Sequence, residues 1–233
     1  MAFGFRAVND DHVVQIDERF PVMQLVETGT VLADVDVLFV RVLTSTQQPW
    51  LFIRGAQVGG YIMGVKFLGG PGQWTGFRLH AVSDLYHSHG LAGRSFGSWQ
   101  YMVGEWAVRR SADRWGMRVW DGKAELLYDA GVQYINMRFQ FQRWRYSHRE
   151  KSGGWVFVVH YLDLSAEASL SGSDRYLLIN PLARERFNLP SYQSTTMRKV
   201  GGLQSNRLEH ISRTSWEGVD DFIQPGIIGS PSA

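Results

Sequence analysis

The stretch that decides the fold class is Tyr61-Ile62-Met63-Gly64-Val65-Lys66-Phe67. Its large apolar side chains recur at every second residue, which is the period of a β-strand with one buried face. Residues 77–81 repeat this pattern, because Phe77 and Leu79 alternate with Arg78 and His80. The alternation predicts half-buried strands in both places.

Three more continuous apolar segments predict strands that are covered on both faces. They are Val37 to Leu43, Trp50 to Ile53 and Trp155 to Leu162. Gly-rich breaks separate the predicted strands, and the best helix candidate, residues 181–187, is only one or two turns long. Short strands with Gly and Pro between them are typical of sandwiches and barrels, so the sequence predicts an all-β fold.

One predicted strand changes phase and is rich in arginine. Phe139 and Phe141 share one face, whereas Trp144 and Tyr146 take the other, which predicts a β-bulge at Gln142-Arg143. Cationic side chains that alternate with aromatic ones could bind single-stranded nucleic acid by stacking on its bases, bind a sugar or form a protein interface. The net charge of +2 argues against nucleic acid. The residues of this strand that we expect at a protein interface are Arg143, Trp144, Arg145 and Tyr146.

An internal repeat divides the chain. Residues 3–25 read FGFRAVNDDHVVQIDERFPVMQL and residues 115–137 read WGMRVWDGKAELLYDAGVQYINM, and the two align without a gap at an offset of 112 residues. Gly4, Arg6 and Asp17 are identical to their counterparts, and turn-forming residues fall at the same place in both copies. Each copy predicts a strand, a tight turn and a second strand. We therefore expect tandem β-sandwich-like modules at residues 1–112 and 113–217.

Residues 218–233 are expected to form a flexible C-terminal arm. Two Pro and two Gly among the last ten residues disfavour regular structure, as in a frayed terminus. The segment nevertheless carries large apolar side chains that are costly to leave in water, which favours an arm docked on a neighbouring chain. The interface residues expected on this arm are Phe222, Ile223, Ile227 and Ile228.

Two motifs that could carry chemistry lie between Asp84 and Gly97. The spacing Gly93-Arg94-Ser95-Phe96-Gly97 matches a nucleophile elbow, but that turn needs a strand before it and a helix after it, and strand-like residues follow here. Asp84, His87 and His89 are of the residue types that bind metals, but no fourth ligand is close in sequence. The sequence therefore predicts no catalytic centre, no bound metal and no cofactor.

Composition excludes several classes of protein. The chain has no Cys, which excludes disulfides and thiol chemistry. No apolar run reaches the roughly 18 residues of a membrane span, and the N-terminus lacks a signal-peptide pattern, so we expect synthesis in a cytoplasm. The 20 Arg greatly outnumber the 4 Lys, and nine Trp and nine Tyr accompany them. These residue types are enriched at interfaces, although a GC-rich genome would also favour Arg.

The segments Phe3 to Asp17 and Trp115 to Asp129 both resemble the opening of small tail proteins of tailed bacteriophages. Those proteins begin with a Gly-containing hairpin, which is followed by an apolar pair and Asp. They are β-sandwich proteins of tail tips, baseplates and fibre bases. The resemblance implies a structural role in the virion without a cofactor. It also implies oligomerisation around the tail axis, contact with other tail or baseplate proteins, and contact with a host-surface glycan or protein. The alternative from the residues alone is a lectin-like, carbohydrate-binding module.

Overall fold

The computed structural model is all-β over the residues that it describes, as the sequence predicts. These residues are 6–8, 14–17, 22–32, 35–55, 60–81, 98–141, 145–152, 155–163, 175–180, 195–200, 207–214 and 226–231. Within them there is no helix, and so none that is long and apolar enough to cross a membrane. The helix candidate at residues 181–187 lies outside the described residues.

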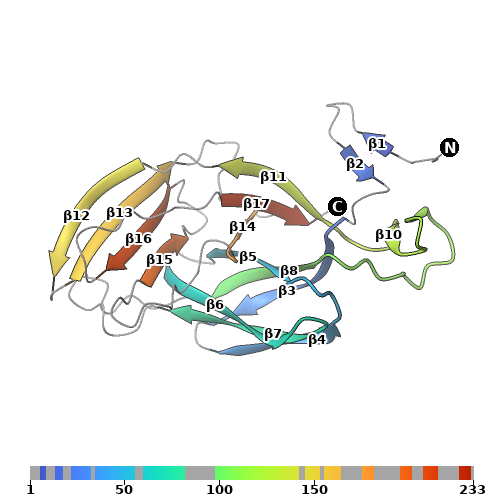
Figure 1. The fold of residues 1–233 in the computed structure, drawn as a ribbon, viewed down its shortest axis with the longest axis horizontal. Coiled ribbons are helices and arrows are strands. Elements are labelled where there is room, and N and C mark those ends of the chain that lie inside the picture. The colour runs from blue at the N-terminus through green and yellow to red at the C-terminus, as the bar shows by residue number, and fades with distance from the viewer. Residues whose placement is uncertain are drawn as a thin grey trace.

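The described strands form two large and two small antiparallel sheets (Figure 1). The six-stranded sheet has the order β11 (Ile135–Phe141), β17 (Gly226–Pro231), β14 (Tyr176–Leu178), β5 (Trp50–Gly55), β8 (Trp99–Glu105) and β3 (Gln24–Val31). The seven-stranded sheet has the order β12 (Arg145–Ser152), β13 (Trp155–Asp163), β16 (Arg207–Thr214), β15 (Thr195–Val200), β6 (Gly60–Gly70), β7 (Gln73–Ala81) and β4 (Asp36–Leu43). The small sheets are the hairpins β1 (Arg6–Val8) with β2 (Val14–Asp17), and β9 (Arg118–Trp120) with β10 (Leu126–Asp129).

The larger hydrophobic core joins the two large sheets, since it draws on β3, β5, β8 and β14 from one and on β4, β6 and β7 from the other. Phe77 and Leu79 are fully buried in it, which confirms the alternation predicted for residues 77–81. Adjacent residues of β5, from Leu51 to Ile53, are fully buried as well. The prediction that this strand is covered on both faces is therefore confirmed.

A second core cluster lies on the other face of the six-stranded sheet, where Phe52 and Met102 pack with Met23 and Ile135. At this end the two edges of the sheet meet. The Leu25 amide donates to the Gln133 carbonyl at 2.9 Å, and the Ile135 amide donates to the Met23 carbonyl at 3.0 Å. The sheet is thus closed like a barrel at one end, where β3 and β11 converge in Figure 1.

Pairing registers repeat between the two halves of the chain. Arg6 pairs with Asp17 in the first hairpin and Arg118 pairs with Asp129 in the second, so the registers coincide at the offset of the sequence repeat. The ladders that follow also correspond. Leu25 pairs with Gly104 just before a register shift in β3, and Met137 pairs with Gly229 just before a register shift in β11.

The order of strands repeats in the same way. Moving inward from one edge of the six-stranded sheet gives β3, β8 and β5, and moving inward from the other gives β11, β17 and β14. At the centre β5 pairs with β14, and β6 pairs with β15 in the other sheet. Each large sheet therefore takes strands from both sides of the boundary expected at residues 112 and 113, and the two halves share their sheets.

The expectation that Val37 to Leu43 are covered on both faces is wrong. Strand β4 is the last strand of the seven-stranded sheet, and its side chains alternate between buried and exposed. Phe39 and Leu43 enter the core, whereas Leu38 and Val40 are 70% and 79% exposed. A run of β-branched and Leu residues looks the same in sequence whether one face or both are covered, and here the outer face is uncovered.

The phase change near Gln142-Arg143 is also explained differently from the prediction. Strand β11 ends at Phe141 in the six-stranded sheet, and β12 begins at Arg145 in the seven-stranded sheet. The change of face therefore marks the passage of the chain from one sheet to the other, and the expected bulge within one strand is wrong. Residues 142–144 themselves lie outside the described residues.

The last segment of the chain is not an arm where the structure describes it. Residues 226–231 form β17, which pairs with β11 on one side and β14 on the other. Gly229 permits close packing, because a Cβ at this position would lie 2.9 Å from Phe52 and 3.0 Å from Ile135. The prediction that Gly and Pro prevent regular structure here is wrong, since these residues suit a strand pressed against a core.

Candidate functional site

The candidate site is the β9–β10 hairpin and the groove beside it. The hairpin turns at Asp121, as the turn-forming pair Asp121-Gly122 predicts. The Oδ1 atom of Asp121 accepts hydrogen bonds from the amides of Lys123 and Glu125, both at 2.8 Å. The Asp121 amide in turn donates to the Glu125 carbonyl at 2.9 Å. The side chain thus replaces a missing backbone partner within the turn and fixes its shape.

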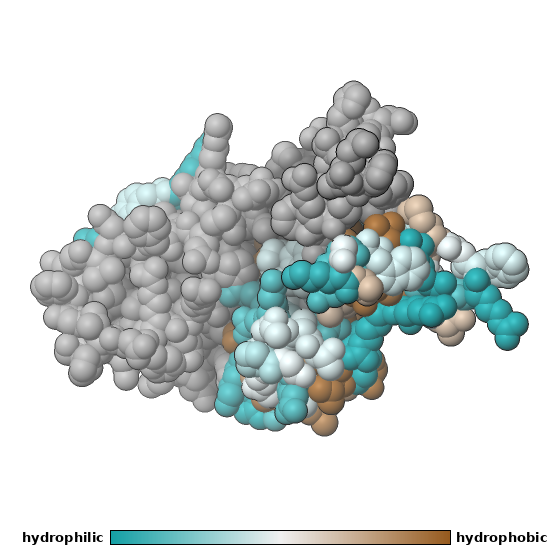
Figure 2. Space-filling model, turned by 45° about the vertical axis from the view of Figure 1, so that its right-hand side comes forward, coloured by the Kyte–Doolittle hydropathy of each residue, from teal (hydrophilic) through white to brown (hydrophobic). Residues whose placement is uncertain are grey.

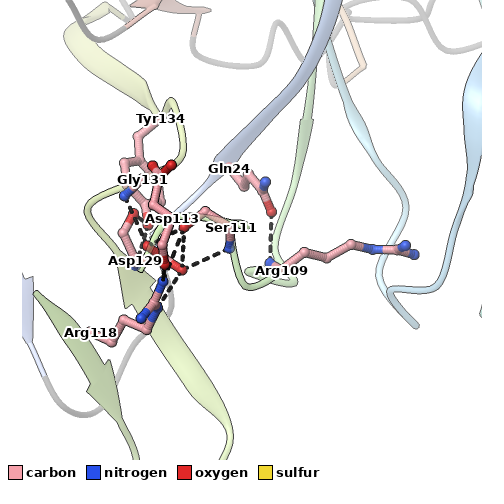
Figure 3. A network of polar contacts seen from close by, with 8 residues as sticks. All are labelled: Gln24, Arg109, Ser111, Asp113, Arg118, Asp129, Gly131 and Tyr134. Carbon is pink, nitrogen blue, oxygen red and sulfur yellow. Dashed lines mark hydrogen bonds and ion pairs between the residues drawn. The ribbon is translucent and has the colours of Figure 1, made fainter. Parts of the chain in front are cut away.

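Asp129 anchors the base of the hairpin (Figure 3). Its carboxylate accepts hydrogen bonds from the Ser111 amide at 2.8 Å, the Ser111 hydroxyl at 3.0 Å and the Gly131 amide at 2.9 Å. Arg118 Nε donates to the same carboxylate at 2.8 Å, and the two side chains are 10% and 1% exposed. One buried carboxylate therefore joins strand β9, strand β10 and the segment that follows β8.

Tyr134 completes the anchor from the other side. Its hydroxyl donates to the Asp129 carbonyl at 2.8 Å and accepts from the Asp129 amide at 2.6 Å. Its ring stacks on Tyr128 with the centroids 5.0 Å apart. Burial, opposed in part by the Asp129 backbone and aided by the nearby Tyr128 and Asp129 charges, raises the pKa of Tyr134 to about 12, so the hydroxyl stays protonated and can donate.

The ionised form of Asp129 is strongly favoured. Burial alone would raise its pKa, but the hydrogen bonds from Arg118, from the Gly131 amide and from Ser111 outweigh burial and hold the pKa of this carboxyl well below its usual range. The unfolded chain therefore takes up a proton at Asp129 at a higher pH than the folded chain does. The contribution of Asp129 to stability is fully present above the pKa of the unfolded state, which is near 3.8. It is lost as the pH falls toward the lower pKa of the folded state.

We accordingly expect the free energy of unfolding of the wild type to fall toward that of an Asp129→Asn variant in acid. Because one proton is involved, the difference between the two proteins should shrink by up to about 1.4 kcal/mol per pH unit below roughly pH 4. Urea titrations of both proteins between neutral pH and pH 2 measure the difference. A difference that is constant across this range would contradict the assignment.

A groove of about 700 Å³ separates the hairpin from the body of the molecule. Residues 44–47 form one wall, residues 106–108 form the base, and the hairpin residues Asp121, Glu125, Leu126 and Leu127 form the other wall. Trp106 packs edge-on against Trp50 with the centroids 5.2 Å apart. Hydroxyl, amide and carboxylate groups thus surround an apolar base, a composition that suits an extended segment of a partner.

A second buried carboxylate fixes the opposite wall. Glu105 is fully buried and accepts hydrogen bonds from the Thr44 amide at 2.9 Å and the Ser45 amide at 3.1 Å. It also forms an ion pair with Arg41 at 3.0 Å. The Trp74 indole donates to the Ser45 carbonyl at 3.0 Å. Both walls of the groove are therefore held by carboxylates with several donors each, which pre-organises the groove.

An exposed apolar stripe lies on the outer side of β4 and the residues before it. Its five members are between 47% and 79% exposed, and they are Leu32, Val35, Leu38, Val40 and Val42. Figure 2 shows apolar surface reaching the lower edge of the described part of the molecule, the edge at which Figure 1 places β4. Exposed apolar side chains gathered along one strand are typical of interaction sites.

The structure places the predicted interface residues as follows. Arg145 and Tyr146 are exposed on β12, whereas Ile227 and Ile228 belong to β17 in the other large sheet. The two pairs of residues therefore belong to different sheets. The remaining sequence-derived candidates lie outside the described residues, namely Asp84, His87, His89, Ser95, Arg143, Trp144, Phe222 and Ile223.

Sequence reasoning did not single out the Asp129 anchor, although the sequence contains its signal. Arg118 and Asp129 are two of the residues that the internal repeat preserves, as Arg6 and Asp17. A charged pair kept at the same spacing in both copies of a hairpin indicates a shared structural role. Glu105 and the apolar stripe carry no comparable signal, because both depend on the tertiary fold.

Comparison of the chain with protein-family models, with curated proteins and with solved structures finds no match.

Proposed function

We propose that this chain is a structural component of a bacteriophage tail tip or baseplate and assembles there with other tail proteins. The exposed apolar stripe carries the proposal. Edge strands normally bear charges or are covered, because an uncovered apolar edge invites association. Strand β4 instead exposes Leu38, Val40 and Val42 in alternation, which fits a surface that another chain covers.

The tail-protein assignment rests on the hairpins that resemble the start of such proteins. Both segments form hairpins in the same register, with Arg6 opposite Asp17 and Arg118 opposite Asp129, and this supports the proposal. We further propose that the chain arose by duplication of one sandwich-like module, the first copy contributing β1 to β8 and the second β9 to β17. The matching register shifts at Leu25/Glu27 and Met137/Phe139 support this origin.

A substitution that introduces a charge into the apolar stripe tests the proposal. In a phage that encodes the chain, Val40→Asp should lower its incorporation into purified particles about tenfold, the effect of losing one well-buried interface residue. The folded chain itself should be almost unaffected, because Val40 is 79% exposed. Quantitative mass spectrometry of the particles gives the result.

Thr28→Asp is the matched control, since Thr28 is exposed on β3 and lies outside the apolar stripe. It should be incorporated like the wild type. Absence of the wild-type chain from particles would overturn the proposal. A purified chain that stays monomeric, and whose tryptophan fluorescence responds to sugar, would instead support a carbohydrate-binding module.

A further inference from the structure

Exposed arginines of β12 and two carboxylates that line the groove lie at opposite ends of the molecule. Figure 1 places β12 at one end of the longest axis and β10 of the hairpin at the other. Strand β12 is the edge strand of the seven-stranded sheet opposite to β4, and it exposes Arg145, Tyr146 and Arg149. At the far end, Asp121 and Glu125 are the charged residues among the described ones that line the groove.

These surfaces are complementary in more than charge. The groove is open to solvent, and residues 44–47 and the hairpin both line it. Trp106, Leu126 and Leu127 are among the residues that line the groove, and they offer apolar contacts for an aromatic or aliphatic group. A strand that carries two guanidinium groups and a Tyr ring matches such a groove, because guanidinium groups pair with carboxylates and stack on rings.

We propose that copies of this chain associate head to tail, with the β12 edge of one copy seated in the groove of the next. The inference rests on the proposed role in an assembly and specifies the contact between copies. Because the two surfaces differ, the contact is heterologous, and successive copies form a closed ring or an open filament. The carboxylates and guanidinium groups set the register and orientation of docking.

Charge exchange tests the contact in the purified full-length chain. The wild type should self-associate in sedimentation velocity experiments, more strongly at low salt because the contact is partly electrostatic. Glu125→Lys and Arg149→Glu should each weaken association at least tenfold, since each places like charges opposite one another. Both side chains are exposed, so neither change should alter folding.

The double variant E125K/R149E is the decisive arm, because it restores opposite charges with their places exchanged. It should recover association, and an equimolar mixture of the two single variants should recover it as well. Arg110→Glu, at an exposed position outside the groove lining, is the control and should behave like the wild type. Wild-type behaviour of both single variants, or no recovery in the double variant, would overturn the proposal.

A wild-type chain that is monomeric at every concentration and salt would also overturn the head-to-tail contact. If such a chain were still found in purified particles, the proposed structural role would stand and only the contact between copies would fall. If it were absent from particles, both would fall.

Discussion

Asp129→Asn is expected to lower the free energy of unfolding by about 3–5 kcal/mol, the usual cost of removing one partner from a buried ion pair. The substitution keeps the shape of the side chain but leaves the Arg118 guanidinium, which is 10% exposed, without a counter-charge. It also replaces one carboxylate oxygen, an acceptor, by an NH2 group, which is a donor. The amides of Ser111 and Gly131, which donate to different oxygens of the carboxylate, can then no longer both be satisfied. Urea unfolding followed by circular dichroism measures the loss.

The chain offers a matched control for this change. Asp36 and Arg78 form an ion pair of similar length, 2.6 Å, but the two side chains are 43% and 38% exposed. Solvent screens such a pair, so Asp36→Asn should cost less than about 1 kcal/mol. Equal losses in the two variants would show that burial does not set the strength of the Asp129 anchor.

The second large effect is expected from deleting residues 226–233. Strand β17 is an interior strand with hydrogen-bonded neighbours on both sides, β11 and β14. Its removal would leave two new edges inside the six-stranded sheet and would open the core around Phe52 and Ile135, which Gly229 contacts closely. The loss should approach the whole stability of an ordinary domain, about 5–15 kcal/mol, so the truncated chain should not fold.

Deletion of Ser232 and Ala233 alone is the control and should leave the fold intact, because β17 ends at Pro231. Circular dichroism and gel filtration of the two truncated chains distinguish the cases. A chain shortened by residues 226–233 that stays folded, but is not incorporated into particles, would restore the interpretation of this segment as a docking arm.

The local sequence pattern was sufficient to predict a strand wherever that strand has one buried and one exposed face. Phe77, Leu79 and Arg78 lie as their alternation predicts, and the repeat at residues 3–25 and 115–137 predicts two hairpins that the structure contains. The local pattern failed for β17, because Gly229 serves the packing of distant residues rather than a turn. The contact of Gly229 with Phe52 joins residues that no local window can relate.

The candidate site was less accessible to sequence than the fold. Glu105 gains its role only when β8 brings it beneath Thr44 and Ser45, some sixty residues earlier in the chain. The apolar stripe is indistinguishable in sequence from a buried strand, since exposure depends on which neighbours the sheet supplies. The Asp129 anchor is the exception, because the repeat preserves its charged pair.

Closure of the six-stranded sheet has a consequence for the biogenesis of the protein. Strand β5 emerges from the ribosome early, but its neighbour β14 is made more than a hundred residues later, and β17 is the last of the described strands to be made. While only the first half has been made, the edge of β5 that later pairs with β14 therefore has no native hydrogen-bond partner. Native pairings of such long sequence separation form slowly and leave strand edges exposed meanwhile. Folding should consequently be cooperative across both halves and should be completed only after β17 has been made, and low temperature or chaperones should raise the yield of soluble protein.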